Sequence, residues 1–133
     1  MAKRKAKTPA EIIREQADTI RDSRARWLDA LQNGLSDPTW SDGANMNLLR
    51  NHILAAKYTI RTLTADGTAE VPEEFFWETP PYIDANYFAH PKSKRAMRIM
   101  SAGVRCCNRE IPANEKELKQ FVERTKQSQL SLF

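Results

Sequence analysis

Residues 8–34 read TPAEIIREQADTIRDSRARWLDALQNG, and this stretch contains both a start and a stop signal for one long helix. Thr8 and Glu11 have the spacing of a capping box, and Pro9 suits the first helical position because it has no N–H to leave unpaired. Asn33 followed by Gly34 favours a C-terminal stop. We therefore predict a helix over residues 9–33. Its apolar side chains recur on one face, which we expect to be buried: Ile13, Ala17, Ile20, Trp27 and Leu31.

A second apolar stripe follows a loop that contains Asp37-Pro38 and Asp42-Gly43, and it predicts a helix over residues 45–65. Steps of three and four residues connect its members: Met46, Leu49, Ile53, Ala56, Ile60 and Leu63. Because the loop is short, we expect the two helices to pack antiparallel as a hairpin. The stripe is also heptad-like, so the sequence leaves self-association open.

Residues 68–91 are rich in proline and aromatic residues, and the prolines exclude a long helix there. We expect an irregular loop whose rings cover the helical core, with a recognition surface as the alternative. The aromatic residues are Phe75, Phe76, Trp77, Tyr82, Tyr87 and Phe88. The loop is also acidic, with Glu70, Glu73, Glu74, Glu78 and Asp84.

Two further helices are predicted beyond this loop, over residues 93–109 and 114–125. The first places Ala96, Met97, Met100, Gly103, Val104 and Cys107 on one side and Arg95, Arg98, Arg105 and Arg109 on the other. Asn114 and Glu117 form the capping signal of the second, whose apolar contact is made by Leu118, Phe121 and Val122. The sequence therefore predicts a small all-α domain over residues 9–125, between a basic tail (1–8) and a flexible tail (126–133).

The composition fits one soluble domain in the cytoplasm. The chain has 133 residues, a net charge of +4 and a pI near 9.2, and it has no run of 18 apolar residues and no apolar signal core. Cys106 and Cys107 are adjacent, which is too close for an unstrained disulfide and fits a reducing compartment. We expect no contact with membranes.

The last five residues of the sequence are Gln129-Leu130-Ser131-Leu132-Phe133. Leu132 and Phe133 are adjacent apolar anchors, Leu130 is a third, and the Gln129 amide can make several hydrogen bonds. QLSLF resembles the motif by which bacterial polymerases and repair factors bind the sliding clamp, the β subunit of DNA polymerase III. The resemblance implies that all five residues contact the clamp. The alternative is that the apolar residues close the domain's own core.

Two internal segments carry a second resemblance. Residues 46–52 (MNLLRNH) and 80–87 (PPYIDANY) are similar to segments of small proteins from bacterial phages and mobile elements. This resemblance implies a phage or plasmid factor that borrows or blocks the host replication machinery.

Two basic groups are candidates for contact with duplex DNA. The first lies in the N-terminal tail and the second on the predicted third helix: Lys3, Arg4, Lys5 and Lys7, and Arg95, Arg98, Arg105 and Arg109. Guanidinium groups suit phosphate contacts, and such binding would be non-specific and salt-dependent. The alternative is a solvated surface, in part paired with the acidic loop.

Catalysis has little support in the sequence. It has no Gly-rich phosphate loop and no Cys-x-x-Cys pair, and we read His52 as a surface or packing residue. We expect a non-enzymatic protein with no catalytic residues, metal or cofactor. One alternative is a clamp-tethered nuclease whose Mg²⁺ is held by carboxylates of the acidic loop: Glu73, Glu74, Glu78 and Asp84, with His90. Another is a DNA-binding regulator whose tail is structural.

Overall fold

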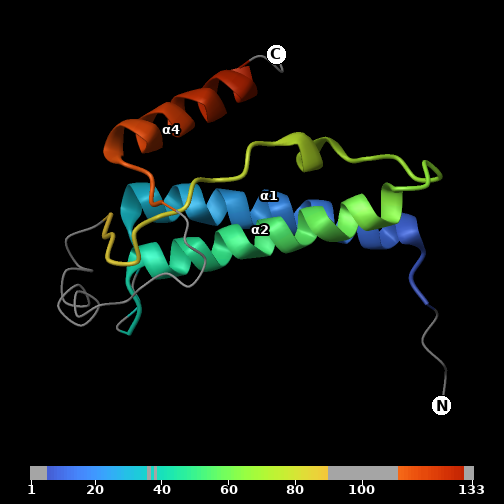
Figure 1. Ribbon diagram of the computed structural model, residues 1–133, viewed down its shortest axis with the longest axis horizontal. Helices are drawn as coiled ribbons and strands as arrows, with labels where there is room; N and C mark the ends of the chain where they lie inside the picture. Colours follow the sequence, from blue (N-terminus) through green and yellow to red (C-terminus); the bar gives the residue numbers. More distant parts are fainter. Residues whose placement is uncertain (1–5, 36, 38, 90–110, 131–133) are drawn as a thin grey trace.

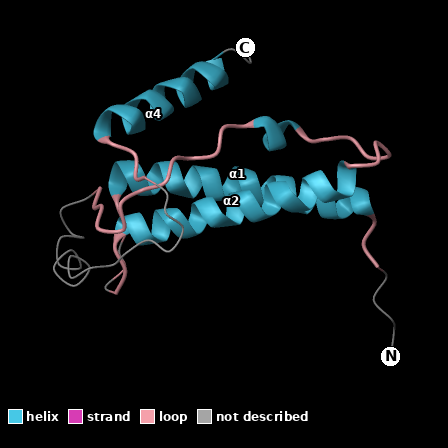
Figure 2. Ribbon diagram, in the orientation of Figure 1, coloured by secondary structure: helices cyan, strands magenta, loops and turns pink. Residues whose placement is uncertain are grey.

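The structure is a computed structural model that describes residues 6–35, 37, 39–89 and 111–130, with side chains as far as Lys126. Its described residues form three α-helices and one short 3₁₀-helix, joined by loops without any strand (Figures 1 and 2). The elements are α1 (Pro9–Asn33), α2 (Asp42–Thr64), η1 (Glu73–Phe76) and α4 (Glu115–Leu130). The all-α prediction is confirmed, and the predicted helix over 93–109 lies outside the described residues.

α1 has the predicted bounds, and its caps explain them. The N–H of Glu11 donates to the Thr8 hydroxyl oxygen at 3.2 Å, which satisfies one unpaired donor of the first turn. At the other end Gly34 has a φ of 74°, and its N–H donates to the carbonyl of Ala30 at 2.9 Å. Glycine adopts this left-handed backbone without a steric penalty, so the helix ends there.

α2 begins at Asp42, three residues before the predicted start at residue 45. The Ser41 hydroxyl accepts a hydrogen bond from the N–H of Ala44 at 3.0 Å and donates to the carbonyl of Ala85. Ser41 is therefore a buried N-cap that also fixes the end of a distant loop. The apolar stripe alone could not show this start because the first turn of α2 contains Gly43 and no large apolar residue.

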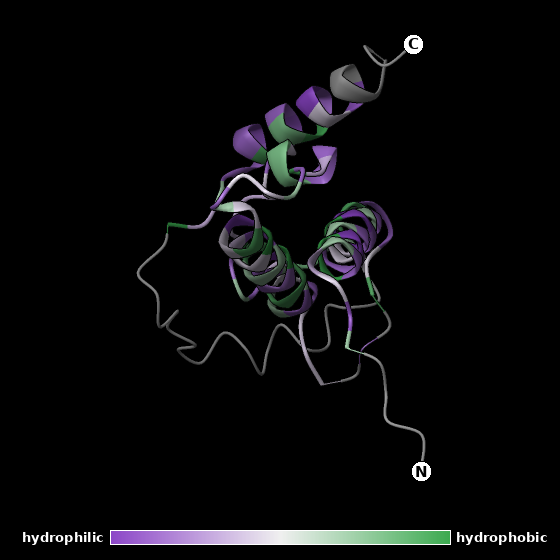
Figure 3. Cartoon of the chain, turned by 90° about the vertical axis from the view of Figure 1, so that its right-hand side faces the viewer, coloured by the Kyte–Doolittle hydropathy of each residue, from purple (hydrophilic) through white to green (hydrophobic). Residues whose placement is uncertain are grey.

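α1 and α2 lie side by side as the predicted antiparallel hairpin, which Figure 3 views nearly end-on. Two apolar clusters fill the space between and around them. One contains Ile13, Ile20, Ile53, Ala56 and Ile60. The other contains Trp27, Ala30, Met46, Ile83, Leu118 and Phe121. Both predicted stripes are confirmed as the core faces, with Leu31, Leu49 and Leu63 partly buried at the edges.

Residues 65–89, here called the strap, run along the hairpin as the core-covering loop that the sequence predicts (Figure 1). Phe75 and Trp77 pack against the Ile13 cluster, and Tyr82 is buried. The Asn47 side chain pairs with both backbone groups of Ile83, accepting from its N–H at 2.8 Å and donating to its carbonyl at 2.7 Å. Phe76 is the exception among the rings, since 73% of it is exposed.

α4 continues to Leu130, five residues past the predicted end at residue 125. Residues 126–130 contain no Gly or Pro, so nothing in the sequence stops the helix at that point. The predicted cap is confirmed as a reciprocal capping box: the N–H of Glu117 donates to the Asn114 side chain at 2.9 Å, and the N–H of Asn114 donates to the Glu117 carboxylate at 3.3 Å. No described helix is long and apolar enough to cross a membrane.

The strap meets the start of α2 at Gly43, which allows the two backbones to touch. The Gly43 N–H donates to the carbonyl of Tyr87 at 2.9 Å, and a Cβ at this position would lie 2.0 Å from the carbonyl oxygen of Asp84. Only a residue without a side chain fits this contact. The glycine is thus required by close approach rather than by its φ angle.

We predict that Gly43→Ala lowers the free energy of unfolding by about 3 kcal/mol, because the strap backbone must move away from α2. Gly67→Ala is the matched control, since Gly67 has a φ of 78° but open space around its Cβ position. That variant should lose about 1 kcal/mol from backbone strain alone. Urea unfolding followed by circular dichroism measures both, and equal losses would contradict the predicted clash.

Candidate functional site

The motif begins with Gln129 and Leu130 at the end of α4, and contacts with α1 and the strap position that helix. Phe121 is fully buried, and its ring meets Trp27 edge-on at 5.2 Å between centroids with an interplanar angle of 77°. Leu118 is buried one turn earlier in the same cluster. Together they seat the first half of α4 on the hairpin.

A bidentate ion pair and a buried hydroxyl fix the next turn of α4. Arg124 donates to both oxygens of Glu78 in the strap, at 2.8 and 2.6 Å. These bonds lower the pKa of Glu78 and raise that of Arg124. Thr125 is buried, and its hydroxyl oxygen accepts from Arg24 of α1 at 3.4 Å. Among the described side chains, Thr125 makes the last contact of α4 with the rest of the fold.

The first two motif residues, Gln129 and Leu130, have helical backbone in the last turn of α4. Ser131, Leu132 and Phe133 lie outside the described residues, as do the side chains from residue 127 onward. Figures 1 and 3 agree that the C-terminal end of α4 points away from the hairpin.

Most of the predicted DNA-contacting residues also lie outside the described residues: Lys3, Arg4, Lys5, Arg95, Arg98, Arg105 and Arg109. Lys7 is exposed and pairs with Glu15 at 2.6 Å.

The charge of the sequence is divided unevenly between the described residues and the rest. The described residues carry 12 Lys and Arg against 16 Asp and Glu, a net charge of −4. Residues 1–5 and 90–110 carry nine against one, a net charge of +8.

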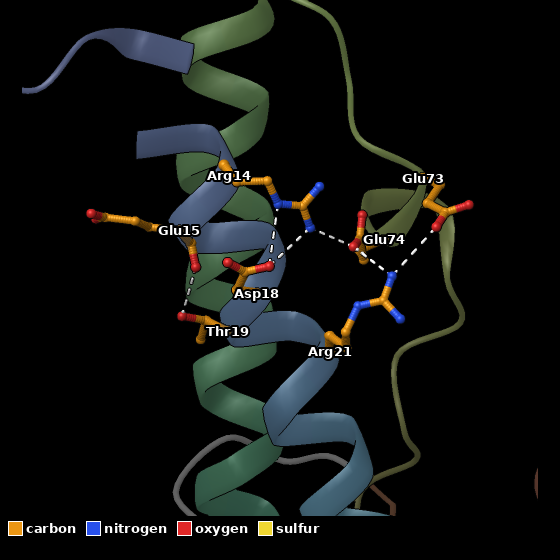
Figure 4. A network of polar contacts seen from close by, with 7 residues as sticks. All are labelled: Arg14, Glu15, Asp18, Thr19, Arg21, Glu73 and Glu74. Atoms are coloured by element: carbon orange, nitrogen blue, oxygen red, sulfur yellow. Dashed lines mark hydrogen bonds and ion pairs between the residues drawn. The ribbon is translucent and has the colours of Figure 1, made fainter. Parts of the chain in front are cut away.

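The acidic strap is paired with arginines that the sequence analysis had not singled out (Figure 4). Glu74 is only 1% exposed, and one of its oxygens accepts from Arg14 at 2.5 Å and from Arg21 at 2.9 Å. Burial alone would raise the pKa of Glu74, but these bonds outweigh it and lower the pKa. Glu73 lies 3.4 Å from Arg21. The available signal was the spacing of Arg14 and Arg21, which puts them on one face of α1, two turns apart.

The carboxylates proposed for a nuclease metal site are engaged separately. Glu73 and Glu74 pair with α1, Glu78 pairs with α4, and Asp84 accepts from the N–H of Asn86 at 2.8 Å. Over the described residues, no group of three or more His, Cys, Asp or Glu is placed to hold a metal ion. His90 lies outside these residues, and His52 is exposed on α2.

No protein family, curated protein or solved structure matches this chain. We therefore infer its function from its own residues and their geometry.

The buried carboxylate of Glu74 should make stability depend on pH. Because its pKa in the folded protein lies below the ordinary value of 4.5, its stabilising contribution is present above that pH and is lost as the pH falls through the folded-state pKa. We predict that Glu74→Gln lowers the free energy of unfolding by about 2 kcal/mol at pH 7 and flattens the acid limb of the stability curve.

Glu73→Gln is the matched control, because Glu73 is the adjacent residue and is mostly exposed. It should change stability at pH 7 by less than about 0.5 kcal/mol and leave the acid limb as in the wild type. Urea unfolding between pH 7 and pH 3 measures both variants. Parallel pH profiles for the wild type and Glu74→Gln would contradict the assignment.

Proposed function

We propose that this protein is a non-enzymatic accessory or modulator of DNA replication or repair that binds the bacterial sliding clamp through Gln129–Phe133. The observation that carries the proposal is the sequence QLSLF, which matches the clamp-binding motif at all five positions. The geometry of α4 supports it, because the helix is fixed by Phe121 and Arg124 and ends beyond these contacts. A peptide placed there can enter a partner's pocket without disturbing the core.

The proposed contact follows from the chemistry of the five side chains. Leu132 and Phe133 fill an apolar pocket, Leu130 adds a third anchor, and Gln129 supplies amide hydrogen bonds. A short peptide loses conformational entropy when it binds, so the affinity should be about micromolar without a second contact. Contact between the basic segments and DNA would raise it through avidity, since a clamp encircles duplex DNA.

A phage or mobile element is the proposed source of the protein. The two segments that resemble phage and mobile-element proteins, 46–52 and 80–87, contact each other in this fold. Asn47 pairs with the backbone of Ile83, and Arg50 donates to the carbonyl of Pro80 at 2.9 Å. They therefore form one packing unit between α2 and the strap, which a relative that shares both segments would also need. A factor of this kind would recruit the clamp or compete with host partners for its pocket.

We predict that the full chain binds purified bacterial clamp saturably at about micromolar strength, and that Leu132→Ala/Phe133→Ala weakens binding by about 100-fold or more. Isothermal titration calorimetry measures both. The matched control is Leu48→Ala/Tyr58→Ala, which removes two exposed apolar side chains from α2 and should bind like the wild type.

Stability measurements on the same variants separate binding from folding. An unchanged melting temperature in Leu132→Ala/Phe133→Ala, together with lost binding, fits the proposal. A lower melting temperature would instead indicate that these side chains belong to the core. Absence of binding by the well-folded wild type would refute the clamp proposal.

We also predict weak, non-specific binding of duplex DNA through the basic segments. Replacing Arg95, Arg98, Arg105 and Arg109 with Gln should weaken binding by about tenfold or more and reduce its salt dependence, because each phosphate contact releases bound counterions. Fluorescence anisotropy with a labelled duplex at several salt concentrations measures this effect.

The matched control removes four cations from the described body, as Gln variants of Arg26, Arg61, Lys116 and Lys119. It should weaken binding less than the first set, because the described residues are net negative. Equal losses of DNA affinity in the two variants would show that binding depends only on the total charge of the protein. The assignment to residues 90–110 would then be wrong.

A further inference from the structure

Four cations from three helices contact one tripeptide of the strap, Trp77–Thr79. One of them, Arg21, lies 4.8 Å from the centre of the Trp77 ring and is paired with Glu73 and Glu74. Lys57 of α2 donates to the carbonyl of Trp77 at 2.5 Å and to the hydroxyl of Thr79 at 2.9 Å. Arg124 of α4 donates to the carboxylate of Glu78, the residue between Trp77 and Thr79. The guanidinium of Arg24, from α1, lies 4.8 Å from the centre of the Trp77 ring. We call Arg24, Lys57 and Arg124 the cationic junction.

The cationic junction has more positive than negative charge. Glu78 is the one carboxylate of the described residues that forms an ion pair with it, and that pair is with Arg124. Arg24 is 9% exposed, and its Nε has no hydrogen-bond partner. Three cations against one carboxylate leave an excess of two positive charges at a half-buried place.

The surroundings make this excess unfavourable in the absence of an anion. Burial lowers the pKa of Arg24, and Glu78 offsets this only in part. Burial also lowers the pKa of Lys57, repulsion from Arg24 lowers it further, and Glu78 again opposes the shift. Buried charges without a counter-charge are costly, so a bound anion would be stabilised by Arg24 and Lys57.

The cationic junction is reachable from solvent on the side of Arg124. The side chains of Arg124 and Glu78 are 53% and 47% exposed. Glu78 occupies the guanidinium fork of Arg124 with two parallel hydrogen bonds, which is the geometry in which arginine also holds two phosphate oxygens. The hydroxyls of Thr79 and Thr125 add neutral polar groups beside the cations.

We propose that the cationic junction binds a dianionic phosphate group, as inorganic phosphate or a phosphate monoester, and that Glu78 is an internal competitor for the same cations. The excess of two charges matches a dianion. The proposal does not depend on clamp binding, because the junction involves none of residues 129–133.

Titration of the full chain with inorganic phosphate tests the proposal, with chloride used to hold ionic strength constant and binding followed by ¹H–¹⁵N NMR shifts. We expect saturable binding at millimolar concentration or below. Lys57→Met and Arg124→Met should each weaken it at least tenfold. Arg26→Met, which removes an exposed arginine of α1 that pairs with Asp22, should leave it unchanged.

Glu78→Gln is the most discriminating variant. If Glu78 competes with phosphate, the variant should bind phosphate more tightly, whereas if Glu78 supports the site, it should bind phosphate more weakly. Removal of the competing carboxylate should strengthen phosphate binding about tenfold even though the loss of the Arg124 pair lowers the melting temperature. Weaker or unchanged phosphate binding in a folded Glu78→Gln variant would overturn the proposal. Phosphate also stabilises proteins non-specifically because it is excluded from their surface. This effect would be equal in all variants and would produce no saturable NMR shift.

Dimethyl phosphate distinguishes the two sources of a phosphate group, because it carries one charge, like the nucleic-acid backbone. We expect it to bind at least tenfold more weakly than inorganic phosphate or adenosine monophosphate. Equal affinity would show that the junction does not select a dianion and would overturn that assignment in favour of a backbone phosphate. No saturable binding of any of the three probes to folded wild type would refute the site.

Discussion

The edge-on contact between Trp27 and Phe121 is the interaction on which the arrangement of this fold depends. Trp27 is fully buried on α1, beside Met46 of α2 and Ile83 of the strap, and Phe121 brings α4 to the same place. Large aromatic side chains contribute much of the apolar area that a small domain can bury. Four segments that are distant in sequence therefore share one cluster, and the position of each depends on the others.

Ion pairs add to the apolar contacts of Phe75, Trp77 and Ile83 in holding the strap over this core. Glu74 is held by Arg14 and Arg21 of α1, while Glu78 is held by Arg124 of α4. The strap is thus tied to both α1 and α4, and these acidic residues serve as counterions to the helices. The same pairing leaves Arg24 and Lys57 without an ion-pair partner in the described part of the chain, which is the physical origin of the proposed phosphate site.

The described helical body and the proposed interaction segments differ in net charge. The body carries a net charge of −4, so it is a poor surface for nucleic acid. The positive charge is concentrated in residues 1–5 and 90–110, and the proposed clamp-binding peptide begins in the last turn of α4. In the proposed function, the hairpin, strap and α4 are the scaffold, and residues 1–5, 90–110 and 129–133 bind the partners.

The sequence by itself determined the helical hairpin, the bounds of α1 and both capping boxes, because caps and apolar periodicity act between residues three or four apart. It also contained the whole basis of the clamp proposal, since a short docking motif is defined by adjacent residues. Only the tertiary structure decided that Ser41 caps α2 against Ala85, that Gly43 must lack a side chain, and that Arg24, Lys57 and Arg124 converge on Trp77–Thr79. These contacts join residues 20 or more positions apart, and their energies depend on distances that no local pattern encodes.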